Sequence, residues 1–185
     1  MFNLLGAGVY FLVASTALFA ASMAGSGRPG DRIHWIGTAA LFAGFCASRI
    51  FGLEAGLTDL LREGVKAGGG YSERGQWQVP ITIALLAILG ALAWYFVAKW
   101  RKRSPGSRAK AVFISRFAAI SLLLFAAVRV ASLHAIDKLI YAGGPVRLNY
   151  LIDLGLTGTV LAMAVLYAYR TMQRRAGARR SSRRR

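Results

Sequence analysis

The feature that most constrains this chain is a set of long apolar blocks that carry no charge. The first, Phe2 to Gly27, runs for 26 residues without a charged side chain. Two more lie between Gly75 and Lys99 and between Arg147 and Arg170, the second interrupted only by Asp153. Blocks of this length are typical of membrane-spanning helices, because in hydrocarbon a helix satisfies its own backbone polar groups. The sequence therefore predicts a polytopic membrane protein.

We predict an all-α bundle of five transmembrane helices, forming a single domain over residues 1–175. The predicted spans are 4–23, 35–58, 79–98, 111–135 and 150–169. The first span could instead be a cleaved signal peptide, because Ala-Ser-Met-Ala-Gly near its end resembles a cleavage site. It lacks a basic segment before the apolar block, and the block is longer than the usual apolar region of a signal peptide, which favours a true span.

The connecting segments alternate in charge. Residues 28–32, 99–110 and 170–185 together hold 16 basic residues and one acidic residue, whereas 54–74 and 134–153 are balanced. The positive-inside rule then places the first set in the cytoplasm, with the N-terminus outside and the C-terminus inside. We expect a multi-pass protein of a bacterial inner membrane. Residues 176–185 are expected to form a disordered basic cytoplasmic tail.

The net charge of +17 would suggest nucleic acid as the partner of a soluble protein. Here the basic residues flank spans, where they hold anionic lipid headgroups, and no aromatic residues are interleaved for base stacking. We therefore predict a bilayer with anionic headgroups as the partner and regard nucleic acid as unlikely. The predicted headgroup contacts are Arg101, Lys102, Arg103, Arg174, Arg175, Arg179 and Arg180.

Two arginines, Arg49 and Arg129, lie inside predicted spans toward their outer ends. A charge at such depth costs about 2.5–3.5 kcal/mol on insertion scales and usually faces the bundle interior with a partner. We predict one outer-leaflet polar cluster. Its members are Arg49, Glu54, Asp59, Arg129, Ser132, His134, Asp137, Asn149 and Asp153. The cluster could lock helices together, or it could bind a ligand, a substrate or a proton.

The chain offers little for metal or cofactor chemistry. Cys46 is the single cysteine, which rules out an intrachain disulfide and a Cys-based metal site. The two histidines, His34 and His134, fall at opposite faces of the predicted membrane, so they cannot share a haem or a metal. No nucleophile elbow, metalloprotease motif or phosphate loop is present. No cofactor and no metal site is predicted.

Two segments of the chain resemble each other. Residues 49–55 read Arg-Ile-Phe-Gly-Leu-Glu-Ala, and residues 129–135 read Arg-Val-Ala-Ser-Leu-His-Ala. Each is followed by a predicted outer loop and a further span. A two-helix unit could therefore be used twice in the same orientation, as spans two-three and four-five, as in some transporters. The match is short, and chance resemblance remains the alternative.

Two further patterns resemble a family of small five-helix bacterial inner-membrane proteins for which no activity is established. One runs from Leu53 to Arg62 and is followed by Gly70, Tyr71, Arg74 and Gln78; the other runs from Val128 to Asp137 and is followed by 148–150 and 153–155. The resemblance implies the five-helix architecture. This chain departs from the family pattern at Arg49, Ala135, Tyr150 and Asp153, where that pattern has Asn, His, Trp and Glu. The departure at Arg49 weakens any fixed catalytic role for that residue.

Three functions are compatible with these features. An accessory or assembly subunit of a larger membrane complex fits the small size and the glycine-rich spans. A small transporter, or a carrier of protons or a solute, fits the intramembrane charges and the suggested repeat. A membrane enzyme acting on a lipid-linked substrate could use His134, Asp137, Glu54 and Asp59 as acid and base. The sequence favours the first, and leans away from an enzyme.

Overall fold

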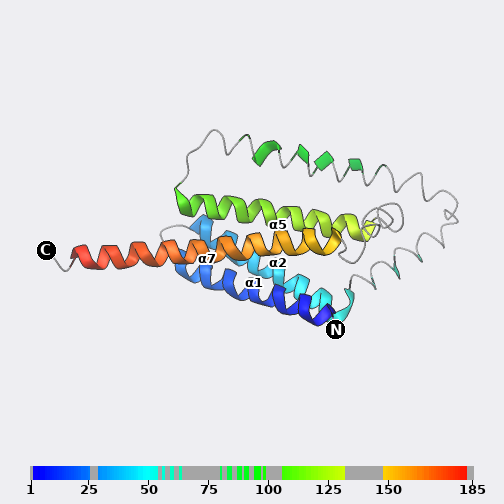
Figure 1. Ribbon diagram of the computed structural model, residues 1–185, viewed down its shortest axis with the longest axis horizontal. Helices are drawn as coiled ribbons and strands as arrows, with labels where there is room; N and C mark the ends of the chain where they lie inside the picture. The colour runs from blue at the N-terminus through cyan, green and yellow to red at the C-terminus, as the bar shows by residue number, and fades with distance from the viewer. Residues whose placement is uncertain are drawn as a thin grey trace.

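The computed structural model describes residues 2–25, 29–53, 106–131 and 148–182, together with separate residues between 56 and 98 (Figure 1). Four long helices occupy these ranges: α1 (Phe2–Ala24), α2 (Pro29–Phe51), α5 (Ser107–Ala131) and α7 (Leu148–Ser182). Each is long and apolar enough to cross a membrane, and no strand occurs in the described part of the chain. The prediction of an all-α bundle of membrane-length helices is confirmed to this extent.

The described helices run along the bundle in alternating directions up to the end of α2. α1 runs away from the end where the N-terminus lies, which we call the N-terminal end, and α2 returns to it (Figure 1). α5 starts at the opposite, C-terminal end, so the last residue of α2, Phe51, and the first of α5, Ser107, lie at opposite ends of the bundle (Figure 1). The described residues between Pro80 and Ala98 are helical, and Phe96 stacks on Phe113 and Phe117 of α5. The remainder of the predicted third span lies outside the described residues.

Local sequence explains where α1 and α2 end. Pro29 starts α2, where its missing N–H costs nothing and its fixed φ suits the first turn. Gly25 and Gly52 follow the last residues of α1 and α2 with φ of 64° and 65°, a left-handed conformation that glycine adopts without strain and that commonly ends a helix. α2 thus covers 29–51 rather than the expected 35–58, because Gly52 ends it early and Pro29 starts it early.

The bundle buries small residues and exposes large ones. α1 packs against α2 and α7 through alanines, including Ala17 and Ala20, which are fully buried. Its large side chains, such as Phe11 and Leu18, are 66% and 56% exposed. In water this arrangement would be unfavourable, but between membrane helices small residues permit close backbone approach while lipid solvates the large ones. The packing therefore supports a membrane-embedded bundle.

Two groups of large side chains fill the space that the small residues leave. Near the C-terminal end, fully buried Trp35 packs on Tyr167 with ring centroids 5.3 Å apart. Nearer the N-terminal end, Tyr10 and Phe42 meet edge to face at 5.9 Å. Both clusters join residues of α1, α2, α5 and α7, so all four helices share one continuous interior.

α7 continues well past the bundle and projects from its C-terminal end (Figure 1). The expected disordered tail, 176–185, is helical as far as Ser182. Alanine and arginine are strong helix formers, and extending an existing helix avoids the cost of nucleating a new one. Composition alone misses this, because it weighs the charge of the segment and not the helix that precedes it.

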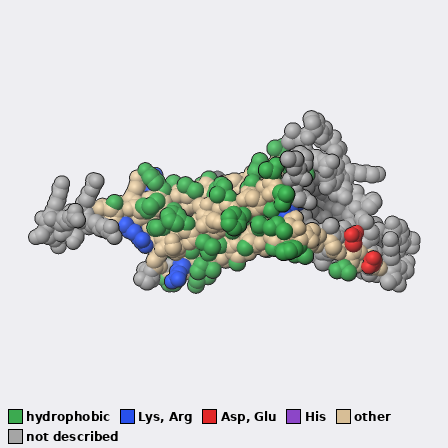
Figure 2. Space-filling view, turned by 90° about the horizontal axis from the view of Figure 1, so that it is seen from below, with side chains coloured by type: hydrophobic (Ala, Val, Ile, Leu, Met, Phe, Trp, Pro, Cys, Tyr) green, Lys and Arg blue, Asp and Glu red, His purple; other side chains and the backbone are tan. Residues whose placement is uncertain are grey.

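The charges separate along the long axis of the molecule. Lys and Arg side chains cluster toward the C-terminal end, and the exposed acidic side chains that are visible lie toward the other end (Figure 2). α2 and α5 run in the same direction, as the suggested repeat requires. Residues 54, 55 and 132–135 of the repeated motif lie outside the described residues, so the repeat stays a prediction.

Candidate functional site

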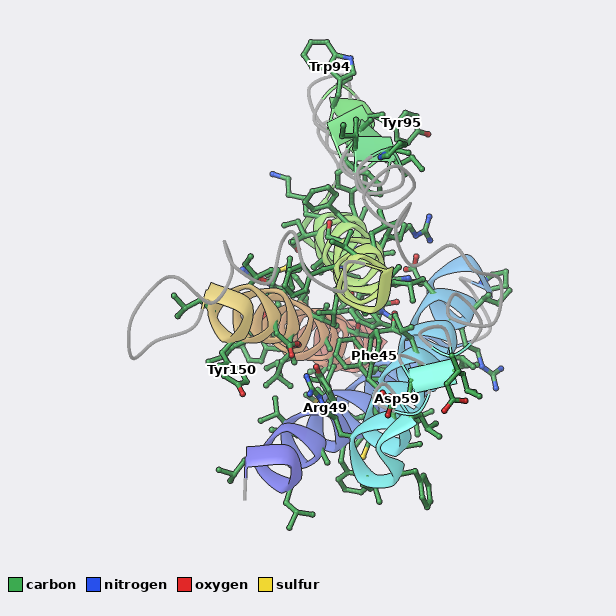
Figure 3. All side chains as sticks on the ribbon, turned by 90° about the vertical axis from the view of Figure 1, so that its right-hand side faces the viewer. Phe45, Arg49, Asp59, Trp94, Tyr95 and Tyr150 are labelled. Atoms are coloured by element: carbon green, nitrogen blue, oxygen red, sulfur yellow. The ribbon has the colours of Figure 1, made fainter. Side chains whose placement is uncertain are left out.

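A polar site occupies the N-terminal end of the bundle, where three helices converge. Tyr10 lies in the third turn of α1, Arg49 in the last turn of α2, and Asp153 in the second turn of α7. Figure 3 looks onto this end and shows Arg49 between α1 and α7, with Asp59 farther out beside α2. The antiparallel course of α1 and α2 brings the start of one beside the end of the other.

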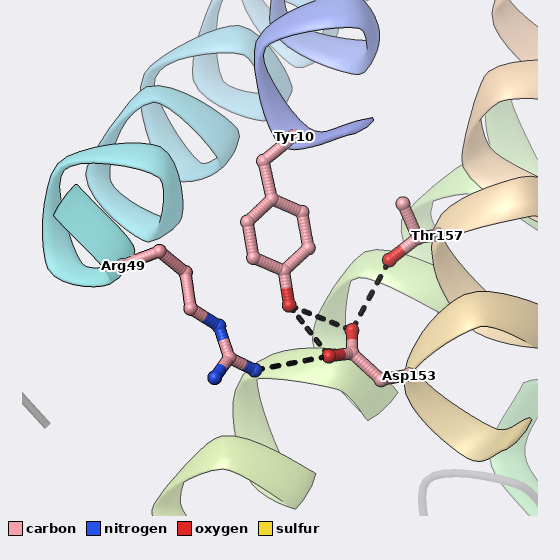
Figure 4. A network of polar contacts seen from close by, with 4 residues as sticks. All are labelled: Tyr10, Arg49, Asp153 and Thr157. Carbon is pink, nitrogen blue, oxygen red and sulfur yellow. Dashed lines mark hydrogen bonds and ion pairs between the residues drawn. The ribbon is translucent and has the colours of Figure 1, made fainter. Parts of the chain in front are cut away.

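Asp153 is the centre of the network (Figure 4). The Tyr10 hydroxyl lies 2.7 Å from both carboxylate oxygens and donates to them. Arg49 Nη2 forms an ion pair with Asp153 Oδ2 at 3.3 Å, and the side chains of the pair are only 16% and 15% exposed. Thr157, one turn later on α7, donates from Oγ1 to Asp153 Oδ1 at 3.4 Å. The carboxylate therefore accepts from all three side chains.

The Tyr10 ring is held from several sides. It contacts Phe42 and Phe45 of α2 at centroid distances of 5.9 and 5.6 Å. The Arg49 guanidinium carbon lies 6.0 Å from the same ring centroid, at the outer range of a cation–π contact. Because the ring is fixed by packing, its hydroxyl is aimed at Asp153 before any ligand arrives. The site is thus pre-organised.

A pocket of about 380 Å³ opens beside this network, between α1 and α7. Its lining is mostly apolar, with the polar network at one side. The lining residues are Leu5, Gly6, Val9, Tyr10, Arg49, Tyr150, Asp153, Leu154 and Thr157. The positions on α7 are spaced by three and four residues, so they share one face of the helix. An apolar cavity with a few convergent polar groups is the usual form of a small-molecule site.

The structure brings together two members of the cluster that the sequence predicts, Arg49 and Asp153. A third, Asp59, is exposed and does not line the pocket. The side chain of Arg129 lies outside the described residues, although its backbone belongs to α5. The other predicted members whose side chains lie outside the described residues are Glu54, Ser132, His134, Asp137 and Asn149.

Sequence reasoning missed Tyr10 and Thr157. Thr157 stands one helical turn after Asp153, a spacing that could have linked them. Tyr10 gave a weaker signal, because a tyrosine in an apolar block usually marks a membrane interface. Cys46 is half-buried, and its thiol donates to the Ala7 carbonyl at 3.4 Å.

The basic residues at the C-terminal end divide in two groups. Arg175 donates from Nη2 to the Met23 carbonyl at 3.0 Å, which places a cation at the C-terminus of α1 where the helix dipole is negative. Arg174 is exposed, and headgroup binding stays its expected role. The side chains of Arg101, Lys102, Arg103, Arg179 and Arg180 lie outside the described residues.

Asp153 and Arg49 neutralise each other, and the described part of the chain contains no group of three or more His, Cys, Asp or Glu side chains that could hold a metal ion. No protein-family model, no curated protein sequence and no solved structure matches this chain. Function therefore has to be argued from the site itself.

Proposed function

We propose that the protein is a small membrane carrier that binds a lipid-like molecule in the pocket between α1 and α7. The observation that carries the proposal is the pairing of an apolar cavity of about 380 Å³ with a pre-organised polar network at its side. A chain or ring of the ligand would occupy the space beside Leu5, Val9 and Leu154. Its polar head would meet Arg49 and Asp153.

The charges of the site indicate which polar head group of the ligand it can bind. Arg49 and Asp153 compensate each other, so a strongly charged head would have to displace one of them from an ion pair. An uncharged head with carbonyl or hydroxyl groups avoids this, because a carbonyl accepts from Arg49 and a hydroxyl donates to Asp153. Such a head on a hydrophobic chain enters the pocket from the lipid, which is where the exposed faces of α1 and α7 lie.

The proposal is tested by filling the pocket. Val9→Trp places an indole in the cavity, and Leu12→Trp is the matched control, because Leu12 is 53% exposed on the same helix and does not line the pocket. Each protein is purified gently from membranes, and the small molecules that it retains are identified by mass spectrometry. A compound retained by the wild type and the control but lost from Val9→Trp supports the proposal. Identical profiles for all three would end it.

A second candidate, the accessory subunit favoured by the sequence, is supported by the outer face of α2. Ala40, Ala43 and Gly44 are all exposed there, and a Cβ at Gly44 would meet nothing within 4 Å. Small residues on a lipid-facing helix permit close approach by another helix. Gly44→Leu is expected to release a partner that co-purifies with the wild type. Absence of any stoichiometric partner from native membranes would remove this candidate.

The third possibility, an enzyme acting on a lipid-linked substrate, gains no support from the described residues. Its expected acid–base groups Glu54, His134 and Asp137 lie outside them, and Asp59 does not line the pocket. Loss of these four side chains without any change in the lipid or glycan profile would argue the enzyme away.

We further propose that the C-terminal end of the bundle faces the cytoplasm, and that the membrane is a bacterial inner membrane. The first part is supported by the basic side chains that gather at that end (Figure 2). The second rests on the family resemblance of the sequence. The pocket would then open into the outer leaflet.

A further inference from the structure

A second pocket lies in the opposite half of the bundle, between α2 and α5. Its volume is about 320 Å³. α2 packs closely on α1 and much less on α5, which leaves a groove between them. The residues that line it are Gly30, Ile33, His34, Gly37, Thr38, Leu41, Arg116, Ala119, Ile120 and Leu123. Gly30 and Gly37 keep one wall open, because a Cβ at either would meet nothing within 4 Å.

Among the residues that line the groove, Arg116 of α5 is the one with a cationic side chain. Arg116 is exposed and makes no hydrogen bond or ion pair with the residues that the structure describes. The other polar side chains of the groove are neutral or already engaged: His34 Nε2 lies 3.4 Å from Ser115 Oγ, and Thr38 donates to the His34 carbonyl at 2.9 Å. The charge of Arg116 is therefore available to a bound anion.

The position of Arg116 along α5 indicates that the bound anion would be the phosphate of a lipid. It lies nine residues after Ser107, or roughly 13 Å along α5 at about 1.5 Å per residue. Ala119, Ile120 and Leu123 continue the groove further into the apolar part of the helix, and Gly37 and Leu41 do the same on α2. A groove with a cation toward its aqueous end and apolar walls beyond it matches a phospholipid, with its phosphate above its acyl chain.

We propose that the α2–α5 groove holds one anionic phospholipid, with its phosphate on Arg116 and an acyl chain between Gly37 and Leu123. A zwitterionic lipid is a poorer match, because its own ammonium competes with Arg116 for the phosphate. A soluble anion would leave the apolar walls unused. This site is separate from the pocket between α1 and α7, lies toward the other end of the bundle and does not depend on the proposed carrier function.

The test compares lipid retention by native mass spectrometry of the protein in micelles containing phosphatidylglycerol or phosphatidylcholine. The wild type is expected to retain one phosphatidylglycerol preferentially. Arg116→Gln should weaken that preference about tenfold, the usual effect of losing a charge-assisted contact. Arg32→Gln is the matched control: it removes the same charge from an exposed position on α2 that does not line the groove.

A second variant tests the acyl part without changing charge. Gly37→Leu fills the groove and should also abolish retention. Gly8→Leu, at an exposed position of α1 that lines neither pocket, should not. If Arg116→Gln does not fold, this pair decides the question. Equal retention of the two lipids, or equal losses in Arg116→Gln and Arg32→Gln, would overturn the proposal. So would loss of a co-purifying helical partner, rather than of lipid, in Gly37→Leu.

Discussion

Replacing only one partner of the Arg49–Asp153 ion pair should destabilise the protein more than replacing both. Both side chains are about 15% exposed, so neither is well solvated once its partner is lost. Replacing the pair together leaves two neutral groups that can still share a hydrogen bond. The cost of the single changes should therefore exceed the cost of the double change.

We predict this coupling to be about 1 kcal/mol or more, within the usual range for contacting residues. The measurement is a double-mutant cycle with Arg49→Gln, Asp153→Asn and the combined variant, by reversible unfolding in mixed micelles. Strictly additive effects would contradict the geometry of Figure 4. Arg174→Gln serves as a control, because it removes an exposed arginine far from the pair.

Tyr10→Phe removes only the hydroxyl and leaves the ring between Phe42 and Phe45. Because a hydrogen bond to a charged group contributes about 1.5–3 kcal/mol, we expect a loss of stability of that order. The same unfolding assay checks it. Tyr169→Phe is the control, since Tyr169 is 52% exposed. Equal stability of the two variants would mean that the Asp153 contact contributes nothing to the fold.

At the residue scale, the sequence could identify Arg49 and Asp153 as members of a polar cluster, but it could not predict the contacts that they make. Ionisable residues in apolar blocks stand out, which is how Arg49 and Asp153 were found. Tyr10 could not be assigned, because its role depends on α1 lying against both α2 and α7. That contact joins residues 143 positions apart, and no local pattern encodes it.

At the scale of the helix, α1 buries its small side chains and turns its large ones outward. The apolar character of this helix could be read from its sequence, but its buried face could not. Almost every position is apolar, so no polar stripe marks the side that faces water or a neighbour. The start of α2 at Pro29 could not be predicted either, because the charges of Asp31 and Arg32 are typical of a linker.

Adjacent residues of α1 should therefore respond in opposite ways. Ala17→Leu forces a larger side chain into a fully buried position and should destabilise the bundle by about 1–3 kcal/mol. Leu18→Ala, at a position 56% exposed, should change stability little. Thermal unfolding of the two variants in the same detergent checks this. A larger loss of stability in Leu18→Ala than in Ala17→Leu would contradict the assignment of the buried and exposed faces of α1.

At the scale of the whole molecule, the course of the chain places the N-terminus and the projecting end of α7 at opposite ends of the bundle (Figure 1). Four of the five predicted spans correspond to described helices of membrane length. Hydropathy could predict the four described helices of membrane length. It could not predict which helices touch, because that depends on side-chain packing between distant segments.

Cysteine labelling tests the proposed orientation. In a Cys46→Ala background, which removes the single cysteine, Asp59→Cys should react with a membrane-impermeant maleimide in intact bacterial cells. Arg32→Cys should react only after the cells are permeabilised, because it lies at the basic end. The opposite pattern would mean that the C-terminal end faces outward.

The continuity of α7 has a mechanical consequence. Asp153 and Arg175 belong to one unbroken helix and stand 22 residues, or roughly 33 Å, apart along it. Asp153 is hydrogen-bonded to Arg49 and Tyr10 at the N-terminal end, and Arg175 is hydrogen-bonded to the last turn of α1 at the C-terminal end. A helix resists twisting, so a ligand that rotates α7 and separates Asp153 from Arg49 will also strain the hydrogen bond between Arg175 and the Met23 carbonyl. The continuous helix α7 therefore couples the Asp153 network at one end of the bundle mechanically to the Arg175–Met23 contact at the other end.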